Sequence, residues 1–114
     1  MERRTCERYF VSNEIEVKAV GSTSLVRCNT SDVSLSGCYV ATIFPLAEGT
    51  KLEFTMWING ESIKGLGSVR TSHPGVGMGI EFNDLAEEAL SRLDHSLQAS
   101  ASTPSEEKAR SFFR

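Results

Sequence analysis

The chain has 114 residues, a length that fits one domain with a modest hydrophobic core. Its net charge is −3, but residues 1–80 carry eight basic and eight acidic side chains, whereas residues 81–114 carry four and seven. Because the larger part of the chain has no basic excess, its composition argues against duplex nucleic acid as a partner and permits a small, local phosphate site.

The first half of the chain contains three predicted strands. Glu14–Val20 alternates strictly, with Ile15, Val17 and Ala19 on one face and charged side chains on the other, which is typical of a half-buried strand. Two further apolar runs precede Pro45, which ends the second of them. The expected strands are residues 14–20, 24–29 and 38–44. The polar segment Asp32–Gly37 is therefore expected where the second strand passes into the third.

Three more strands are predicted in the second half. Asn59-Gly60 is the strongest short-range signal for a hairpin, and it separates the apolar alternation of residues 52–58 from that of residues 63–70. The last strand repeats the period of two, with Val76, Met78, Ile80 and Phe82 on one face. Six short strands at this spacing predict a closed or nearly closed antiparallel β-barrel.

From Asp84 the apolar period becomes that of a helix. The predicted buried stripe consists of Leu85, Ala89, Leu93 and Leu97, widened by Ala86 and Leu90. Asn83 or Asp84 is expected to cap the helix, and Glu87 follows Asp84 at the spacing of a capping box. We expect this helix to cover an open end or face of the barrel. Residues 99–114 contain too few apolar side chains to offset their ordering entropy and are predicted to form a disordered tail or linker.

Two short polar segments suggest an anion site. The first contains Arg3 and the pattern Arg4-x-x-x-Arg8, whose guanidinium forks suit phosphate oxygens. The second reads Asp32-x-Ser34-x-x-Gly37 and combines a carboxylate, a hydroxyl and a glycine. Each pattern alone also fits a role without a ligand. The first could be a solvated basic terminus, and the second could be a capped turn.

Taken in this order, and followed by alternating strands and one helix, the two motifs resemble the PilZ domain family, bacterial receptors for the second messenger cyclic di-GMP. The resemblance spans about residues 3–97. It implies a mainly β fold: a six-stranded antiparallel β-barrel of the split PilZ type, followed by one C-terminal α-helix. It also implies that residues 1–98 form a cyclic di-GMP-binding domain. The ligand-binding positions that it implies are Arg3, Arg4, Arg8, Asp32, Ser34 and Gly37, with Gly79 as a secondary contact.

The chemistry of these residue types agrees with such a ligand. Arginine can bind a phosphate or the O6/N7 edge of guanine bidentately, and it can stack on a base. A carboxylate such as Asp32 can accept hydrogen bonds from guanine N1–H and N2 but would repel a phosphate, so it is expected to face a base. Ser34 can donate to a phosphate or a base edge, and Gly37 allows close backbone approach. An arginine at position 3 resembles family members that hold an intercalated pair of cyclic di-GMP molecules.

The function that we expect is a non-enzymatic, cytoplasmic cyclic di-GMP receptor that orders its arginine segment on binding and signals to a partner protein. No pair of titratable residues is spaced for acid–base catalysis, and no cofactor or metal site is indicated. Two alternatives remain open. One is a PilZ-type adaptor that acts through protein contacts with weak or no nucleotide binding. The other is a small barrel that binds single-stranded nucleic acid, which would need exposed aromatics interleaved with several lysines.

Other residues carry weaker signals. Gly75, Gly77 and Gly79 alternate with the apolar face of a predicted strand, so they do not indicate a dinucleotide-cofactor loop. His73 and His95 have no ligand or nucleophile at an informative spacing and are expected at the surface. Trp57 could face a partner, the barrel interior or the helix. The three cysteines, Cys6, Cys28 and Cys38, form neither an even set nor a C-x-x-C pair and predict reduced thiols. No apolar run approaches the roughly 20 residues that cross a bilayer.

Overall fold

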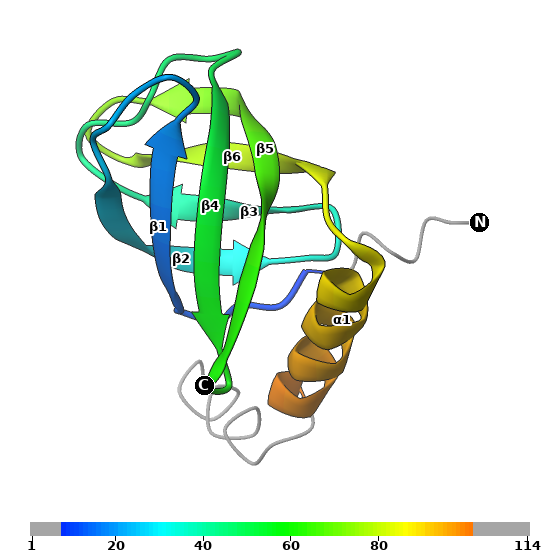
Figure 1. Ribbon diagram of the computed structural model, residues 1–114. Helices are drawn as coiled ribbons and strands as arrows, with labels where there is room; N and C mark the ends of the chain where they lie inside the picture. Colours follow the sequence, from blue (N-terminus) through cyan, green and yellow to red (C-terminus); the bar gives the residue numbers. More distant parts are fainter. Residues whose placement is uncertain (1–7, 102–114) are drawn as a thin grey trace, which may run out of the picture.

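The computed structural model describes residues 8–101, which form a closed antiparallel barrel followed by one helix (Figure 1). The strands are β1 (Glu14–Ala19), β2 (Val26–Val33), β3 (Gly37–Ala41), β4 (Lys51–Ile58), β5 (Glu61–His73) and β6 (Gly77–Asp84), and the helix is α1 (Glu87–Ala101). Around the barrel the strand order is β1-β2-β3-β6-β5-β4. This confirms the predicted mainly β class, the six-stranded antiparallel barrel and the single C-terminal helix.

Alternating side chains of the strands fill the barrel. Ile15 and Val17 of β1 are completely buried, as the period of two predicts, and β4 buries every second residue from Leu52 to Ile58. The predicted hairpin is also confirmed, since Ile58 pairs with Glu61 across a two-residue turn. Asn59 and Gly60 adopt positive φ values of 50° and 79°, as a type I′ turn requires.

Strand β2 is longer than expected and includes Asp32, which the sequence placed in the connection after the strand. The reason is a register shift between β2 and β3: Thr30 pairs with Val40 and Asp32 pairs with Tyr39, so that Ser31 is the extra residue of a bulge. Pairing with β3 continues beyond the bulge and keeps the chain extended to Val33. Apolar alternation alone does not reveal such an extension, because the residues on either side of the bulge are polar.

Helix α1 begins two or three residues later than a cap at Asp84 or Asn83 predicts. Asp84 is still paired with Leu66 in the sheet, and the first helical hydrogen bond runs from Leu90 N to Ala86 O, 2.9 Å. The predicted cap at Asn83 or Asp84 is therefore wrong, because both residues belong to β6. Acidic Glu87 and Glu88 instead occupy the first turn, where they complement the positive end of the helix dipole.

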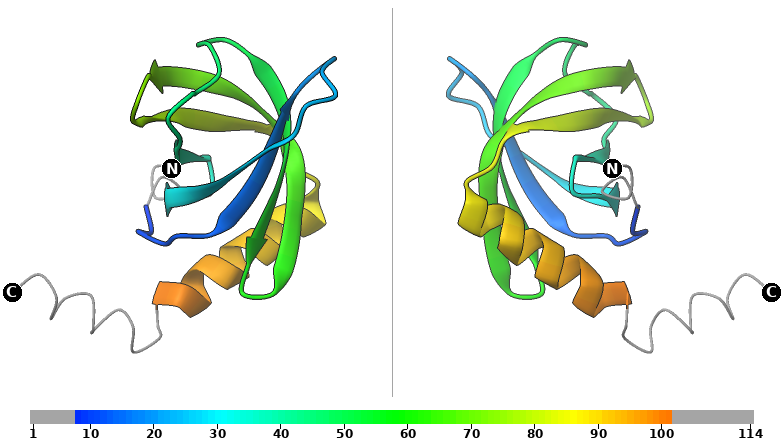
Figure 2. Two further views of the ribbon diagram at one scale, coloured as in Figure 1. Left: turned by 90° about the vertical axis from the view of Figure 1, so that its left-hand side faces the viewer. Right: turned by 90° about the vertical axis from the view of Figure 1, so that its right-hand side faces the viewer.

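The buried stripe of α1 is narrower than predicted. Ala89, Leu93 and Leu97 join the barrel core, and Leu85 packs against it, whereas Ala86 and Leu90 are exposed. The helix runs obliquely beneath the barrel, beside the turn between β4 and β5 (Figure 2). Asn59 Nδ2 donates to Ser96 O over 3.0 Å and Arg92 Nη1 donates to Ser62 O over 3.1 Å. α1 thus closes this end of the core.

The expected boundary at residue 98 falls inside α1, which continues to Ala101. The rest of the predicted tail lies outside the described residues. Within residues 8–101, no helix is long and apolar enough to cross a bilayer.

Candidate ligand-binding site

The chain segment before β1 is attached to the end of β2. Tyr9 and Val33 form an antiparallel pair with N–H to O distances of 2.8 and 2.9 Å in the two directions. Between this pair and β1, the buried hydroxyl of Thr30 donates to Val11 O over 2.8 Å and accepts from Asn13 N over 3.0 Å. These bonds satisfy backbone groups where regular pairing is interrupted, and they fix the path of residues 9–13.

The bulge at Ser31 decides which way Asp32 points. Cys28 and Thr30 face the core, so an uninterrupted alternation would turn Asp32 inward as well. With one residue inserted, Val33 becomes the buried residue and Asp32 faces outward. A one-residue irregularity therefore places a carboxylate on the outer wall of the barrel.

The pairing of Tyr9 with Val33 and the bulge at Ser31 bring the two predicted motifs together. Arg8 Nη1 lies 2.5 Å from Asp32 Oδ1, with side-chain exposures of 54% and 18%. This ion pair joins the second arginine of Arg4-x-x-x-Arg8 to the aspartate of the other motif, 24 residues later. Exposed ion pairs of this kind add little to the stability of a fold. The importance of this pair is that it places the two motifs next to each other. Arg3 and Arg4 lie outside the described residues.

Ser34 and Gly37 form the turn that leads into β3. Ser34 is buried, its N–H donates to Gly37 O over 2.8 Å, and its hydroxyl accepts from Ser36 N over 3.2 Å. This is the turn-capping geometry that short hydroxyl side chains provide. A Cβ at Gly37 would lie only 2.2 Å from Ile80 O. In this structure Ser34 and Gly37 thus shape the turn, and the neighbouring Ser36 is the serine that reaches the pocket.

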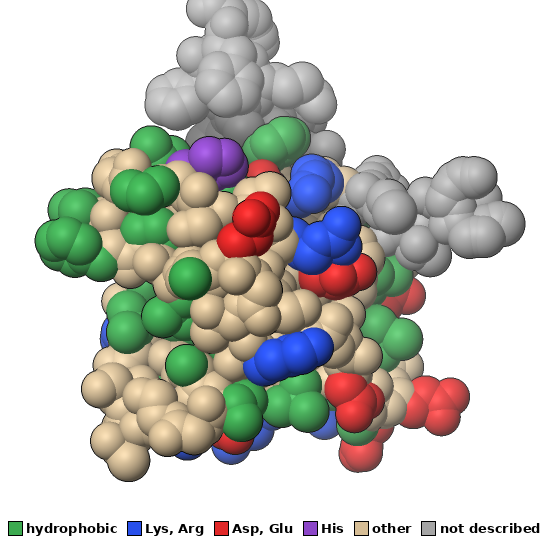
Figure 3. All heavy atoms as spheres, turned by 90° about the horizontal axis from the view of Figure 1, so that it is seen from above, with side chains coloured by type: hydrophobic (Ala, Val, Ile, Leu, Met, Phe, Trp, Pro, Cys, Tyr) green, Lys and Arg blue, Asp and Glu red, His purple; other side chains and the backbone are tan. Residues whose placement is uncertain are grey.

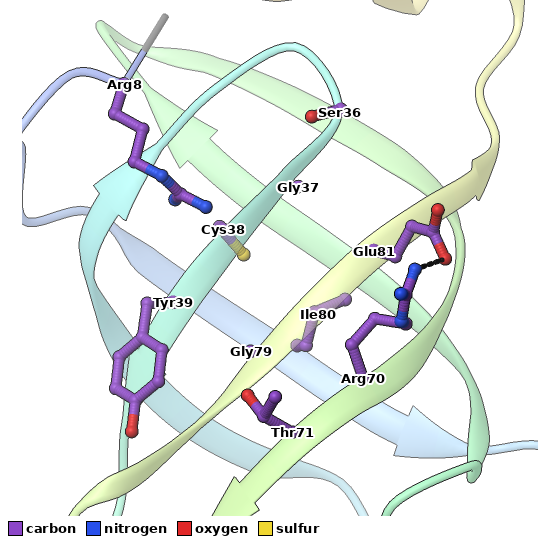
Figure 4. Close-up of a pocket in the computed structure, with 10 residues that line it drawn as sticks. All are labelled: Arg8, Ser36, Gly37, Cys38, Tyr39, Arg70, Thr71, Gly79, Ile80 and Glu81. Atoms are coloured by element: carbon purple, nitrogen blue, oxygen red, sulfur yellow. Dashed lines mark hydrogen bonds and ion pairs between the residues drawn. The ribbon is translucent and has the colours of Figure 1, made fainter. Parts of the chain in front are cut away.

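A pocket of about 300 Å³ opens on the outer wall, over β3, β6 and β5 (Figure 4). Its lining residues are Arg8, Ser36, Gly37, Cys38, Tyr39, Arg70, Thr71, Gly79, Ile80 and Glu81. Of the predicted site residues, Arg8, Gly37 and Gly79 line it, and Asp32 lies beside it, in contact with Arg8. In Figure 4, Arg8 extends over the β3 side of the pocket and Arg70 stands on the β5 side.

Strand register explains why these residues meet. Asp32 is paired with Tyr39, Tyr39 with Gly79, and Gly79 with Thr71, which makes one continuous row across four strands. Directly paired residues share a face of the sheet and lie within side-chain reach. Arg70 follows the buried Val69 and so faces outward by ordinary alternation, whereas a bulge between Val69 and Thr71 turns Thr71 outward as well.

Seven lining residues of the pocket were not predicted from the sequence: Ser36, Cys38, Tyr39, Arg70, Thr71, Ile80 and Glu81. Arg70 Nη1 is held 2.8 Å from Glu81 Oε1, so the pocket has a guanidinium at each side, both paired with a carboxylate. Tyr39 could have been found, because it stands two residues after Gly37 and therefore on the same face of a strand. Arg70 and Glu81 carry no local signal, since only the pairing of β5 with β6 brings them to the site.

The pocket presents charged and hydrogen-bonding side chains, together with one thiol. Burial raises the pKa of the Cys38 thiol to about 12, with a further contribution from the Asp32 carboxylate, so this sulfur stays protonated and weakly nucleophilic at neutral pH. Within residues 8–101, no group of three His, Cys, Asp or Glu side chains is placed to hold a metal ion.

Both histidines and Trp57 lie outside the lining of the pocket. His73 and His95 are exposed, as expected. Trp57, for which three environments were open, is half-buried on the outer face of β4, and the Arg27 guanidinium lies 5.7 Å from its ring centroid. Arg27 is also paired with Glu14 and Glu16. Neither Trp57 nor Arg27 lines the pocket.

Comparison with known proteins agrees with this architecture. The model of the PilZ domain matches residues 2–99. Among solved structures, the PilZ domain of CeSA from a cellulose-synthesizing bacterium superposes with a TM-score of 0.65 at 20% identity, covering 82% of this chain and 98% of that one. The Bacillus subtilis inhibitor of motility (MotI/DgrA) superposes with a TM-score of 0.69 at 15% identity, covering 90% of this chain and 53% of that one. No match was found among curated proteins.

Proposed function

Because the chain belongs to the PilZ domain family, whose members are ligand-binding or adaptor domains, we propose that it is a cyclic di-GMP receptor that binds the dinucleotide on the outer barrel wall, between Arg8 and Arg70. The observation that carries this proposal is the contact between Arg8 and Asp32, which brings the two motifs to the edge of one pocket. The role is recognition rather than catalysis, in keeping with the expected cytoplasmic signalling protein.

Each group of the pocket has a partner on such a ligand. The two phosphodiesters are anions, and the forks of Arg8 and Arg70 match phosphate oxygens or the O6/N7 edge of guanine. Asp32 matches the N1–H and N2 donors of one guanine. When the ligand binds, Arg8 exchanges its exposed contact with Asp32 for a contact with the ligand, which frees the carboxylate for the base. Because an exposed ion pair is worth little, this exchange costs little.

The proposed signal is an ordering of the arginine segment. Residue 8 is the point at which the described chain meets the pocket, and Arg3 and Arg4 precede it closely in sequence. We propose that these arginines close over the bound dinucleotide and that the covered ligand, with the segment on it, forms a new surface for a partner protein.

Replacing Arg8 with alanine is expected to weaken cyclic di-GMP binding by about tenfold or more, the effect of losing one charge-assisted contact. Isothermal titration calorimetry measures the change, and thermal unfolding should show a fold of unchanged stability because Arg8 is largely exposed. The matched control is Arg27→Ala, which removes an exposed arginine paired with carboxylates away from the pocket. Equal affinities of the Arg8 and Arg27 variants would show that the pocket is assigned wrongly.

Arg3 sets the proposed stoichiometry. An intercalated pair of ligands brings more phosphates and exposed guanine faces to the site, and an extra guanidinium can neutralise and stack on them. We expect calorimetry at saturating cyclic di-GMP to give two ligands per chain, and Arg3→Leu to shift the ratio towards one. A ratio near one for the parent protein would remove the intercalated pair and leave the receptor assignment in place.

One observation favours the adaptor alternative as a second candidate. Ile43, Phe44 and Val76 are 64%, 86% and 61% exposed. Their loops are joined by hydrogen bonds from Thr42 N to Val76 O and from Gly75 N to Ile43 O, 3.1 and 2.8 Å. Exposed apolar groups of this size suit a protein contact. For nucleic acid there is less support, because the face in Figure 3 intersperses Lys and Arg with Asp and Glu.

A further inference from the structure

Tyr39 occupies the centre of the row that crosses the pocket wall. Asp32 is its neighbour on β2 and Gly79 its neighbour on β6. Its side chain is half-buried, and Figure 4 shows the ring on the β3 side of the pocket, below Arg8. Part of the ring is therefore covered by protein and part is open to the site.

The inner side of the ring rests on β6 at two glycines, Gly77 and Gly79. A Cβ at Gly77 would lie 2.7 Å from Tyr39 Cε2, and one at Gly79 would lie 3.8 Å from Tyr39 Cδ1. A Cβ at position 77 would collide with the ring and also with Val40 O, 2.3 Å away. Gly77 thus lets the ring lie against the backbone of β6, and the ring is in ordinary contact distance of position 79.

The outer end of the ring is anchored as well. Tyr39 Oη lies 3.0 Å from His73 Nδ1, and the two ring centroids are 6.1 Å apart. His73 is the last residue of β5 and is paired with Gly77. A ring that is supported by β6 and hydrogen-bonded at its hydroxyl has little freedom to rotate, so its open side is held in one orientation before a ligand arrives.

This arrangement fits a purine base. An aromatic surface binds the face of a base by stacking. The carboxylate of Asp32 stands directly across the strand pair, where it can accept from the edge of a base that lies on the ring. Arg8 lines the same pocket and supplies a positive charge for the attached phosphate.

We infer that Tyr39 is the stacking surface for one guanine of the dinucleotide and that His73 is a positioning residue that holds the ring. The inference rests on the proposed function, since it assigns a subsite within the same pocket. A tyrosine that merely covers β6 glycines would contribute to stability but would make no contact with the base, and the two roles respond differently to substitution.

The test compares cyclic di-GMP affinity by calorimetry for the parent protein, Tyr39→Phe and Tyr39→Leu. Tyr39→Phe keeps the aromatic face and should bind within about threefold of the parent, whereas Tyr39→Leu, which covers the glycines without a ring, should bind at least about fivefold more weakly. If Tyr39→Leu binds like the parent, the stacking role is overturned and the receptor remains. If the parent itself does not bind cyclic di-GMP, the proposed function falls and the subsite with it.

A fluorescence experiment tests the same inference and does not require that the Tyr39→Leu variant folds. In a Trp57→Phe background, Tyr39→Trp places the protein's sole indole in the pocket wall. Cyclic di-GMP should quench its fluorescence in proportion to occupancy, because a stacked base contacts the indole face. Unchanged emission at saturation, established by calorimetry, would overturn the inference.

His73 is tested through a double-mutant cycle. His73→Ala should weaken binding about two- to threefold in the parent, the scale of one neutral hydrogen bond. It should have no further effect in the Tyr39→Phe background, where the hydroxyl is already missing. Equal losses in both backgrounds would show that His73 does not act through Tyr39.

Discussion

Replacing Gly37 with alanine is expected to lower the free energy of unfolding by about 3 kcal/mol, the upper range for overpacking in a tightly packed site. The added Cβ would lie 2.2 Å from Ile80 O, and this neighbour is backbone of the paired strand β6, which cannot rotate away as a side chain does. Relief requires that β3 and β6 separate at the pocket. Urea unfolding monitored by circular dichroism measures the loss.

Gly79→Ala is the matched control, because it adds the same atom to the opposite strand of the same pair. Its Cβ would lie 2.7 Å from Thr71 Oγ1, a hydroxyl that can turn aside. We expect a much smaller loss of stability, together with weaker ligand binding, since the new methyl group enters the pocket. Similar stabilities for the two variants would show that the close approach of β3 and β6 is not what position 37 requires.

The second large effect is selectivity. We expect the domain to bind cyclic di-GMP about a hundredfold or more tightly than cyclic di-AMP, because adenine lacks the N1–H and N2 donors and would leave Asp32 facing an acceptor. Parallel calorimetric titrations of the two dinucleotides measure the ratio. Asp32→Ala should weaken cyclic di-GMP binding and bring the two affinities closer together.

Glu81→Gln is the control for this experiment, since Glu81 is the other carboxylate at the pocket and is paired with Arg70. It should leave the selectivity intact. If selectivity is lost in the Glu81 variant and kept in the Asp32 variant, the guanine edge faces β6 rather than β2. Equal affinity of the parent for the two dinucleotides would mean that no carboxylate reads the base.

Local patterns predicted most of the fold because strands and turns carry their signals in consecutive residues. The alternation in β1 and the Asn59-Gly60 turn are examples in which propensity and pairing agree. The start of α1 was predicted wrongly because Asp84 has the chemistry of a helix cap but is held in the sheet by pairing with Leu66. A local preference was outweighed there by a tertiary contact.

The site was predictable only in part, for the same reason. Asp32 and Arg8 were identified from their motifs, but their contact depends on the bulge at Ser31, which reverses the outward face of β2. Thr71 likewise faces the pocket because of a bulge, between Val69 and Thr71. Because a bulge shifts the pairing of two strands, its formation depends on residues that are distant in sequence.

Closure of the barrel restricts how a partner protein can attach. Among residues 8–101, each of the six strands has a hydrogen-bonded neighbour on both sides. Recognition by strand addition needs a free row of backbone donors and acceptors at a sheet edge. The closed barrel of residues 8–101 has no such free edge. A partner must therefore read side chains on the outer surface or the loops at the barrel ends. Its specificity would then respond to single substitutions at those positions rather than to backbone shape.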